Sequence, residues 1–139
     1  MKNLYNTSFD TYVCAGDTIE AIIDKYKFVA RIEYDGDYSI DDDDCHNTDP
    51  TVTGCNAEHY KELLAARESY SKGDWFYCGI IVSLYYNDIL IDSHFNSLWG
   101  LEANYPNSKN EYLTEAANEL LDLDLAAEKV NNLRRKINE

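Results

Sequence analysis

Residues 75–102 read WFYCGIIVSLYYNDILIDSHFNSLWGLE and form the most apolar stretch of the chain. From Trp75 to Tyr86 the side chains are mostly apolar, and β-branched and aromatic residues are frequent, which favours a buried strand over a helix. The pair Asn87–Asp88 is typical of a turn. Ile89–Asp92 and Ser97–Ala103 are then predicted as two returning strands, so the stretch predicts an antiparallel meander within one sheet.

Upstream of this stretch the sequence predicts one strand and two helices. Tyr26–Tyr34 alternates between apolar and polar side chains, which is typical of a half-exposed strand. Thr18 to about Lys25 is predicted as a short helix, because its isoleucines share one helical face. Asn56–Ser71 has apolar residues at helical spacing and ends before Gly73, a typical C-cap residue. Residues 1–16 lack strong periodicity and are predicted to be an irregular arm or a weak strand.

Downstream, Pro106 interrupts the chain, and Ser108 with Glu111 matches the capping-box pattern at the start of a helix. The sequence therefore predicts one long amphipathic helix from about Asn110 to Lys136. Its apolar stripe consists of Leu113, Ala116, Leu120, Leu123, Ala127, Val130 and Ile137.

Together these elements predict a single α+β domain that spans residues 1–139, in which an antiparallel sheet carries helices on one face. An alternative is a mixed sheet, in which the 26–34 strand lies parallel to the strand that begins at Trp75 because a helix connects them. Residues 35–55 lie between these elements and form a polar, acidic loop.

The chain has 26 acidic and 12 basic side chains, for a net charge of -14. Residues 1–60 carry -9 of this charge and residues 61–139 carry -5. Such a charge repels nucleic acid and anionic membranes and attracts basic surfaces. No stretch is long and apolar enough for a membrane span, and the N-terminus lacks the apolar segment of a secretion signal. We therefore expect a soluble intracellular protein with reduced cysteines, of which Cys78 is a small core residue.

Aspartates dominate the loop that follows Tyr34. Mutual repulsion favours an extended, solvated loop unless a positive group approaches it. One interpretation is a merely solvated surface. The other is mimicry of a phosphate backbone, in which carboxylates occupy the lysine and arginine positions of a nucleic-acid-binding protein. The carboxylates in question are Asp35, Asp37, Asp41, Asp42, Asp43, Asp44 and Asp49.

The residues between Asp35 and His59 contain partial patterns for two kinds of metal site. Residues 35–46 begin with oxygen ligands at calcium-loop spacing, but Ile40 replaces the required glycine and His46 stands where glutamate is needed. Zinc accepts the ligand types of Cys45, His46, Cys55 and His59, although adjacent ligands do not readily face one ion. We therefore assign no metal or cofactor, and keep this zinc set as the weaker alternative.

No catalytic motif is present, and we expect no enzyme activity. Cys45 with His46 offers sequence adjacency alone, and Asp92 with His94 is a common surface pattern. The chain has no glycine-rich phosphate loop, no nucleophile elbow and no H-E-x-x-H motif.

The chain has two tryptophans and twelve tyrosines. Base stacking requires a basic groove, which an acidic chain does not provide. Trp75 and Trp99 are therefore predicted to lie in the core. Tyr34, Tyr38 and Tyr105 are instead candidates for anchors at a protein interface, where an amphipathic ring is favourable.

Several segments resemble a family of small, acidic, uncharacterised proteins of bacteriophages and prophages. They are KYKFVARIEYD (25–35), DDDDCHNTDPTVTGC (41–55), GDWFYCGIIVSLYYND (73–88), SLWGLEANYP (97–106) and YLTEAANELL (112–121). The resemblance covers Tyr26 to about Leu125, and its most specific parts are GDWFYCG and SLWGLE. It provides no functional residues, but it implies a protein that acts in the cytoplasm of an infected bacterium.

From this resemblance and the charge asymmetry we expect an inhibitor of a host nucleic-acid-handling defence system, such as a CRISPR or restriction complex. The aspartates from Asp35 to Asp49, with Tyr34 and Tyr38, would contact a basic partner protein. The alternatives are a zinc-stabilised protein and a homo-oligomeric phage accessory protein without such a target.

Overall fold

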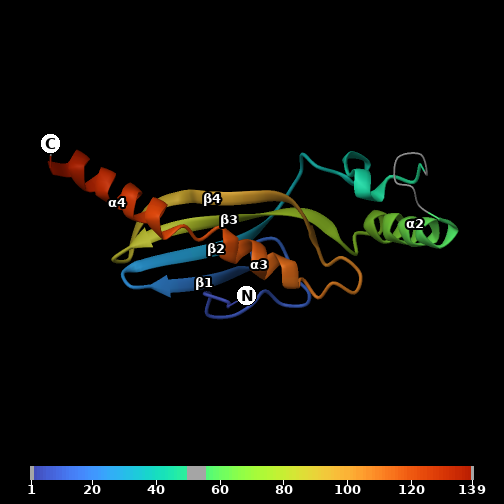
Figure 1. Cartoon of the computed structure of the whole chain (residues 1–139), viewed down its shortest axis with the longest axis horizontal. Coiled ribbons are helices and arrows are strands. Elements are labelled where there is room, and N and C mark those ends of the chain that lie inside the picture. Colours follow the sequence, from blue (N-terminus) through green and yellow to red (C-terminus); the bar gives the residue numbers. More distant parts are fainter. Residues whose placement is uncertain (1, 50–55, 139) are drawn as a thin grey trace.

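The strands form one antiparallel sheet, in which their order, β1-β2-β3-β4, follows the sequence (Figure 1). The computed structural model describes residues 2–49 and 56–138. The protein is a single α+β domain, as predicted. Its strands are β1 (Thr18–Ile23), β2 (Tyr26–Tyr34), β3 (Phe76–Tyr86) and β4 (Ile89–Ala103). Its helices are α2 (Ala57–Ser71), α3 (Glu111–Glu119) and α4 (Leu123–Asn138), and two short 3-10 turns are η1 (Ile40–Asp42) and η2 (Asp44–His46).

The central pair of strands, β2 and β3, is antiparallel. Tyr26 lies opposite Tyr86, and Tyr34 lies opposite Cys78. The alternative of a mixed sheet is therefore wrong. Because Tyr34 ends β2 beside the start of β3, residues 35–75 leave and rejoin the sheet at the same end.

The helix predicted for Thr18 to Lys25 is wrong, because residues 18–23 form the edge strand β1. Ile19 pairs with Ala30, and Ala21 pairs with Phe28. Ile19 and Ala21 are buried by strand alternation, and the β-branched residues of this segment suit a pleated surface.

Ile89–Asp92 and Ser97–Ala103, predicted as separate strands, belong to one long strand, β4. Its pairing with β3 shifts register at three places, so the strand bends without ending.

The predicted C-terminal helix is broken into α3 and α4. The side chain of Asp122 accepts a hydrogen bond from the backbone N–H of Leu125 at 2.9 Å and so caps a new helix. The predicted capping box is also absent, because Asn110, with φ of 61°, precedes α3 and makes no side-chain cap bond. The Ser108 hydroxyl instead accepts a hydrogen bond from the backbone N–H of Asn110.

The main core lies between one face of the sheet and α3. Leu113 of α3 is fully buried there with Phe28 and Ile80 from the central strands. The irregular N-terminal arm completes this core with Tyr5, whose hydroxyl donates a hydrogen bond to the carbonyl of Ala117.

Cys78 is also buried, as predicted, and burial raises the pKa of its thiol to about 12. Cys14, Cys45 and Cys78 are free cysteines.

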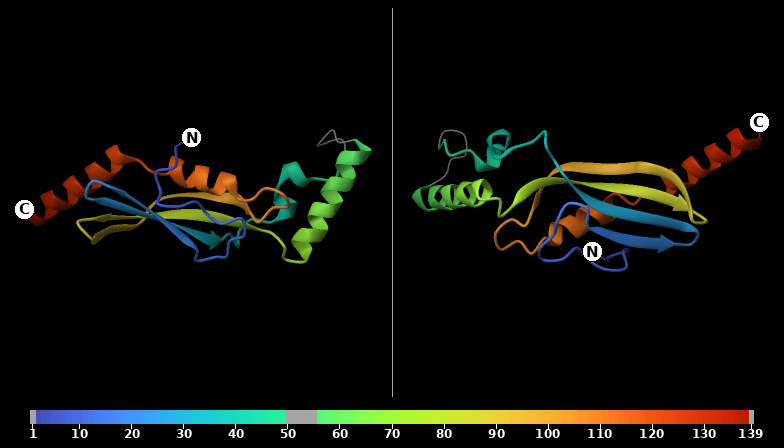
Figure 2. Two further views of the ribbon diagram at one scale, coloured as in Figure 1. Left: turned by 90° about the horizontal axis from the view of Figure 1, so that it is seen from below. Right: turned by 180° about the vertical axis from the view of Figure 1, so that it is seen from behind.

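The two remaining helices extend the molecule in opposite directions (Figure 2). α2 lies beyond the end of the sheet at which β2 finishes, and α4 runs past the opposite end, beside the hairpin tips. Val130 of the predicted stripe is buried, but Leu123 is exposed and Ile137 is 75% exposed. The stripe therefore contacts the sheet along only part of its length. None of the described helices combines the length and apolar character that a membrane crossing requires.

The ion pair between Lys129 and Asp92, 2.7 Å long, joins α4 to β4. The hydrogen bond from Lys129 lowers the pKa of Asp92 below its usual value, although burial opposes the shift. Because the folded-state pKa is lowered, the pair stabilises the fold above the unfolded-state pKa and loses this effect as the pH falls through the folded-state value.

We predict that Lys129→Met lowers the free energy of unfolding by about 0.5–1 kcal/mol at neutral pH, the range for a partly exposed pair. The difference from the unsubstituted protein should shrink as the pH falls from about 4, the ordinary pKa of an aspartate, through the lowered pKa of Asp92. Urea denaturation over a pH series measures both effects. Lys136→Met, at an exposed lysine of the same helix, is the control. An equal loss at neutral and acidic pH would contradict the assignment.

Candidate functional site

Residues 35–49 and 56–75 form a projection at one end of the sheet, which we call the acidic lobe (Figure 1). Residues 35–74 contain eleven acidic and three basic side chains, so they carry -8 of the chain's net charge of -14. Seven of these acidic side chains are the aspartates of residues 35–49, a segment that contains no lysine or arginine. The lobe is therefore the first candidate for a functional surface.

Of the run of four aspartates, Asp41 and Asp42 lie in η1 and Asp44 begins η2, while Asp43 links the two turns, so the run as a whole is folded back on itself. The side chain of Asp42 accepts hydrogen bonds from the backbone N–H and the hydroxyl of Ser39, and these bonds cap the start of η1. Asp43 caps η2, because its side chain accepts a hydrogen bond from the backbone N–H of Cys45. These local bonds offset the repulsion that would otherwise extend the loop.

A positive charge from α2 also lies against this run. Arg67 donates a hydrogen bond to the carboxylate of Asp41 at 2.9 Å and another to the carbonyl oxygen of His46. The positive group that the acidic loop requires is therefore supplied from within the chain. Of the apolar face predicted for α2, Leu63 is buried, whereas Tyr60 and Leu64 are exposed.

An aromatic cluster forms the interior of the lobe. Trp75 is fully buried, as predicted, and its indole N–H donates a hydrogen bond to the carbonyl of Ala66 at 2.9 Å. Tyr77 and Ile40 are buried beside it, and Tyr105 packs on the indole edge to face. This second core joins α2, the aspartate turns and the start of β3 into one unit.

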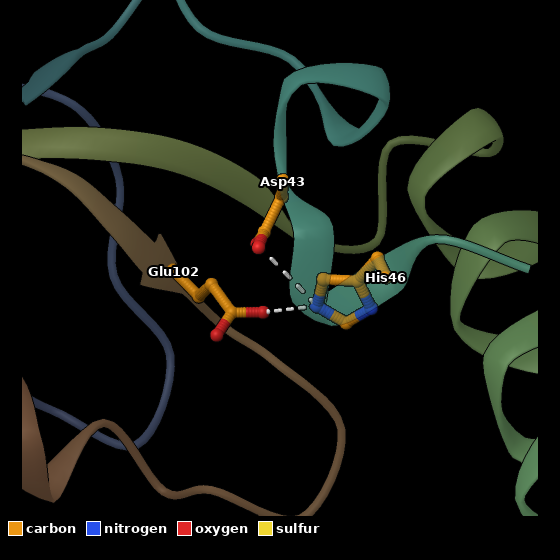
Figure 3. A group of neighbouring side chains, drawn as sticks. All are labelled: Asp43, His46 and Glu102. Carbon is orange, nitrogen blue, oxygen red and sulfur yellow. Dashed lines mark hydrogen bonds and ion pairs between the residues drawn. The ribbon is translucent and has the colours of Figure 1, made fainter. Parts of the chain in front are cut away.

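His46 connects the acidic lobe to β4 (Figure 3). The residue is 5% exposed and packs against the rings of both Trp75 and Tyr105. Its Nε2 is 2.8 Å from Oε2 of Glu102 and 3.8 Å from Oδ2 of Asp43. Asp43 is held in turn by the hydroxyl of Tyr77, which donates a hydrogen bond at 2.9 Å.

Asp43, His46 and Glu102 are the one group of three described residues whose ligand atoms lie close enough to hold a metal ion. The contacts favour a hydrogen-bonded pair instead. Among the described residues, Nδ1 of His46 is buried without a hydrogen-bond partner. A metal on Nε2 would place a buried N–H at Nδ1, whereas metal-bound histidines almost always donate that proton to a partner. A proton on Nε2, donated to Glu102, leaves only a lone pair at Nδ1.

The zinc ligands suggested by the sequence do not gather in the described part of the chain. His46 groups with the two carboxylates, and His59 lies exposed on α2, 3.7 Å from Glu62. Cys45 is exposed, and the negative charge of Asp43 raises the pKa of its thiol, which disfavours both a nucleophile and a zinc ligand. Cys55 lies outside the described residues.

The calcium pattern is not assembled either within residues 2–49 and 56–138. Asp35 is 8% exposed and bonds to backbone N–H groups, whereas Asp41 pairs with Arg67.

Asp92 and His94, the candidate acid–base pair, do not face each other as such a pair. The carboxylate of Asp92 accepts a hydrogen bond from the backbone N–H of His94 and pairs with Lys129. The side chain of His94 instead meets the hydroxyl of Ser97 at 3.0 Å.

The seven aspartates selected from the sequence therefore separate into two groups. Asp35 and Asp43 are largely buried and bond to neighbouring backbone or to Tyr77. The exposed members are Asp37, Asp41, Asp42, Asp44 and Asp49. Of the tyrosines chosen as anchors, Tyr34 is 63% exposed, and Tyr38 and Tyr105 are half-buried.

The prediction that Trp99 lies in the core is wrong, because the residue is 42% exposed. It lines a surface cleft of about 430 Å³ together with Tyr34, Asp35, Gly36, Asp37 and Tyr38. Glu102 was likewise not selected from the sequence, because its contact with His46 spans 56 residues.

No protein-family model matches the chain, and no curated protein or solved structure matches it.

We predict that Glu102→Leu loosens the acidic lobe from the sheet, whereas Glu102→Gln largely preserves the contact. Leucine removes the acceptor for His46, and an unpaired buried donor costs about 1–3 kcal/mol. Glutamine retains an acceptor oxygen. Hydrogen exchange should therefore quicken in residues 40–46 of the leucine variant, while β2 and β3 keep their protection. Equal exchange in the two variants would contradict this anchoring role.

We also predict that the protein's melting temperature is unchanged by a metal chelator and by added zinc, because the His46 contacts are those of a hydrogen bond. Differential scanning calorimetry measures this, with Glu102→Gln as the control. Stabilisation that grows with zinc concentration and is lost in that variant would establish the metal alternative.

Proposed function

We propose that this protein is an acidic interaction protein that binds a basic, nucleic-acid-binding protein and blocks its hold on nucleic acid. The observation that carries the proposal is the set of exposed carboxylates on a lobe that has its own buried core. The members of the set are Asp37, Asp41, Asp42, Asp44 and Asp49. A solvated tail would require neither the Trp75 cluster nor the contact between His46 and Glu102.

The mechanism would be competition for a basic surface. Carboxylates held at fixed positions can pair with lysine and arginine side chains that otherwise bind phosphates, and this pairing depends strongly on salt. Asp35 and Asp43 would act as positioning residues, because the carboxylate of Asp43 bonds to the backbone of Cys45 within the lobe and that of Asp35 bonds to the backbone of Gly100 in β4. Tyr34 and Tyr38 would supply apolar anchoring beside the charges.

The resemblance to bacteriophage proteins suggests the class of target. In a bacterial host, the basic complexes that a phage must neutralise include the CRISPR and restriction systems. We therefore propose that the protein acts in the host cytoplasm as a DNA mimic, with no direct contact with nucleic acid or membrane.

Self-association is the second candidate, and one observation favours it. Arg134, Arg135 and Lys136 lie on the exposed end of α4, beside the exposed apolar side chains of Leu133 and Ile137. This basic, amphipathic segment lies at the opposite end of the molecule from the acidic lobe (Figure 1). Head-to-tail contact between copies would pair the two surfaces, and sedimentation over a range of protein concentrations would detect it.

We predict that the triple variant Asp37→Asn, Asp41→Asn and Asp44→Asn captures far less of the basic proteins in a bacterial lysate than the unsubstituted protein does. These three carboxylates are exposed, so their removal reduces the charge while Asp35 and Asp43 keep their internal bonds. Asp41→Asn also removes the ion pair with Arg67. Pull-downs at low salt measure the loss. The captured proteins should be released by added salt and by double-stranded DNA, since both compete for the same basic groups.

The matched control removes three exposed acidic charges elsewhere, with Asp10→Asn, Glu115→Gln and Glu128→Gln. It should retain capture, because the net charge of the two triple variants is equal. Equal capture by both variants, or complexes indifferent to salt and DNA, would overturn the proposal.

A further inference from the structure

A β-bulge places Trp99 at the edge of the acidic lobe. Cys78 of β3 pairs with Leu101, and Ile80 pairs with Leu98, so Trp99 and Gly100 together lie opposite the single residue Gly79. Gly100 has a φ of 75°, a conformation that favours glycine. Bulges of this kind bend a strand and redirect a side chain.

The redirected indole lies directly against the backbone of Gly79. A Cβ atom added at Gly79 would be 2.2 Å from the Trp99 ring, so only glycine leaves room for the ring. Successive residues of a strand point to opposite faces. Since Cys78 and Ile80 face the main core, the indole covers the opposite face of the sheet. It nevertheless stays 42% exposed, as a rigid aromatic surface beside solvent.

The buried carboxylate of Asp35 fixes the relation between this ring and the loop. One oxygen accepts a hydrogen bond from the backbone N–H of Gly100 at 3.1 Å, and the other accepts one from the backbone N–H of Asp37 at 3.1 Å. The bulge that carries Trp99 and the turn that carries Asp37 are therefore held by one side chain. The cleft of about 430 Å³ lies between them.

The walls of this cleft combine aromatic rings with negative charge. Trp99 and the exposed ring of Tyr34 supply π faces, and Asp37 supplies an exposed carboxylate. A nucleobase would also stack on such rings, but the charge of the lobe repels its phosphates. A planar cation suits both the aromatic rings and the negative charge of the cleft, because a guanidinium group stacks on aromatic faces and pairs with carboxylates.

We propose that this cleft binds the guanidinium group of an arginine side chain from the basic partner, by stacking on Trp99 and pairing with Asp37. The inference rests on the proposed function and deepens it, since it adds a specificity for arginine to a general attraction for positive charge. The exposed aspartates supply the salt-sensitive part of the binding, and Trp99 supplies a part that persists at high salt.

The test compares two short probe peptides, one of alternating glycine and arginine and one of alternating glycine and lysine. Their charges are equal, so electrostatic attraction alone binds them equally. Fluorescence anisotropy should show the arginine peptide binding roughly three- to tenfold more tightly, which corresponds to one stacked cation. The preference should persist at about 1 M salt, where charge attraction is screened beyond roughly 3 Å.

Single-residue variants then test whether Trp99 is the source of the preference for the arginine peptide. Trp99→Ala should abolish it, and Trp99→Phe should retain part of it, because phenylalanine is a weaker cation–π partner than tryptophan. Tyr12→Ala, at an exposed tyrosine of the N-terminal arm, is the control and should retain all of it. Nuclear magnetic resonance should show the Trp99 indole signals shifting on addition of the arginine peptide, with Trp75 unaffected.

The outcomes separate this inference from the proposed function. Salt-sensitive binding of both peptides with equal affinity, or an arginine preference that survives Trp99→Ala, overturns the arginine cleft and leaves the electrostatic function standing. If neither peptide binds at low salt, both the arginine cleft and the proposed function are overturned.

Discussion

The antiparallel pairing of β2 with β3 is the constraint on which the rest of the structure depends. With Tyr34 opposite Cys78, the chain leaves the sheet and re-enters it at one end. The whole acidic segment must therefore be accommodated there as a single connection. Both hairpin turns lie at the other end, beside α4 (Figure 1). A parallel pairing would have required a crossover along the sheet and would have spread the same residues over its face.

Folding the connection into a lobe has an electrostatic cost, because neighbouring carboxylates repel one another. Two unit charges 4 Å apart interact by about 1 kcal/mol even in bulk water. Arg67 offsets part of this cost at Asp41, and Tyr77 offsets part at Asp43. Burial, and then the hydrogen bond to Asp43, raises the pKa of Tyr77, so its hydroxyl stays protonated and able to donate. The aromatic cluster around Trp75 then supplies the apolar burial that keeps the turns in place.

Local sequence patterns predicted β2 by its alternation, β3 by its run of apolar, β-branched and aromatic residues, and α2 by its helical spacing and the glycine after its end. Asn56 accepts the capping bond from His59, and Gly73 follows the helix with a φ of 80°. β1 was mistaken for a helix because Ile19, Ile22 and Ile23 have helical spacing. The pairing with β2 makes the segment a strand, in which Ile22 is 71% exposed. The apolar stripe predicted for the last helix keeps its helical spacing across the break between α3 and α4. The local indication of the break is Asp122, whose side chain caps α4. The helix-period pattern outweighed that signal in the prediction.

The candidate surface was predictable in composition but not in the positions of its individual side chains. The sequence indicates an acidic segment, but the division between buried and exposed aspartates depends on partners such as Gly100, 65 residues from Asp35. Trp99 was assigned to the core because the acidic charge argues against a base-stacking role. Its burial depends instead on the register of the strand, which a bulge shifts. The pair of Trp99 and Gly100 in a strand was the signal for such a bulge, since glycine inside a strand often marks one.

The separation of anchoring from exposed carboxylates argues for recognition over solubility alone. Solubility depends on net charge, which a disordered acidic tail supplies without any core. Here Trp75, Tyr77 and His46 are buried to hold the acidic turns against the sheet, and Asp35 is buried to join them to the Trp99 bulge. A surface already ordered in this way loses less conformational entropy when it binds, so more of the contact energy becomes affinity. An ordered array also presents its charges at fixed separations, which allows one basic surface to be distinguished from another.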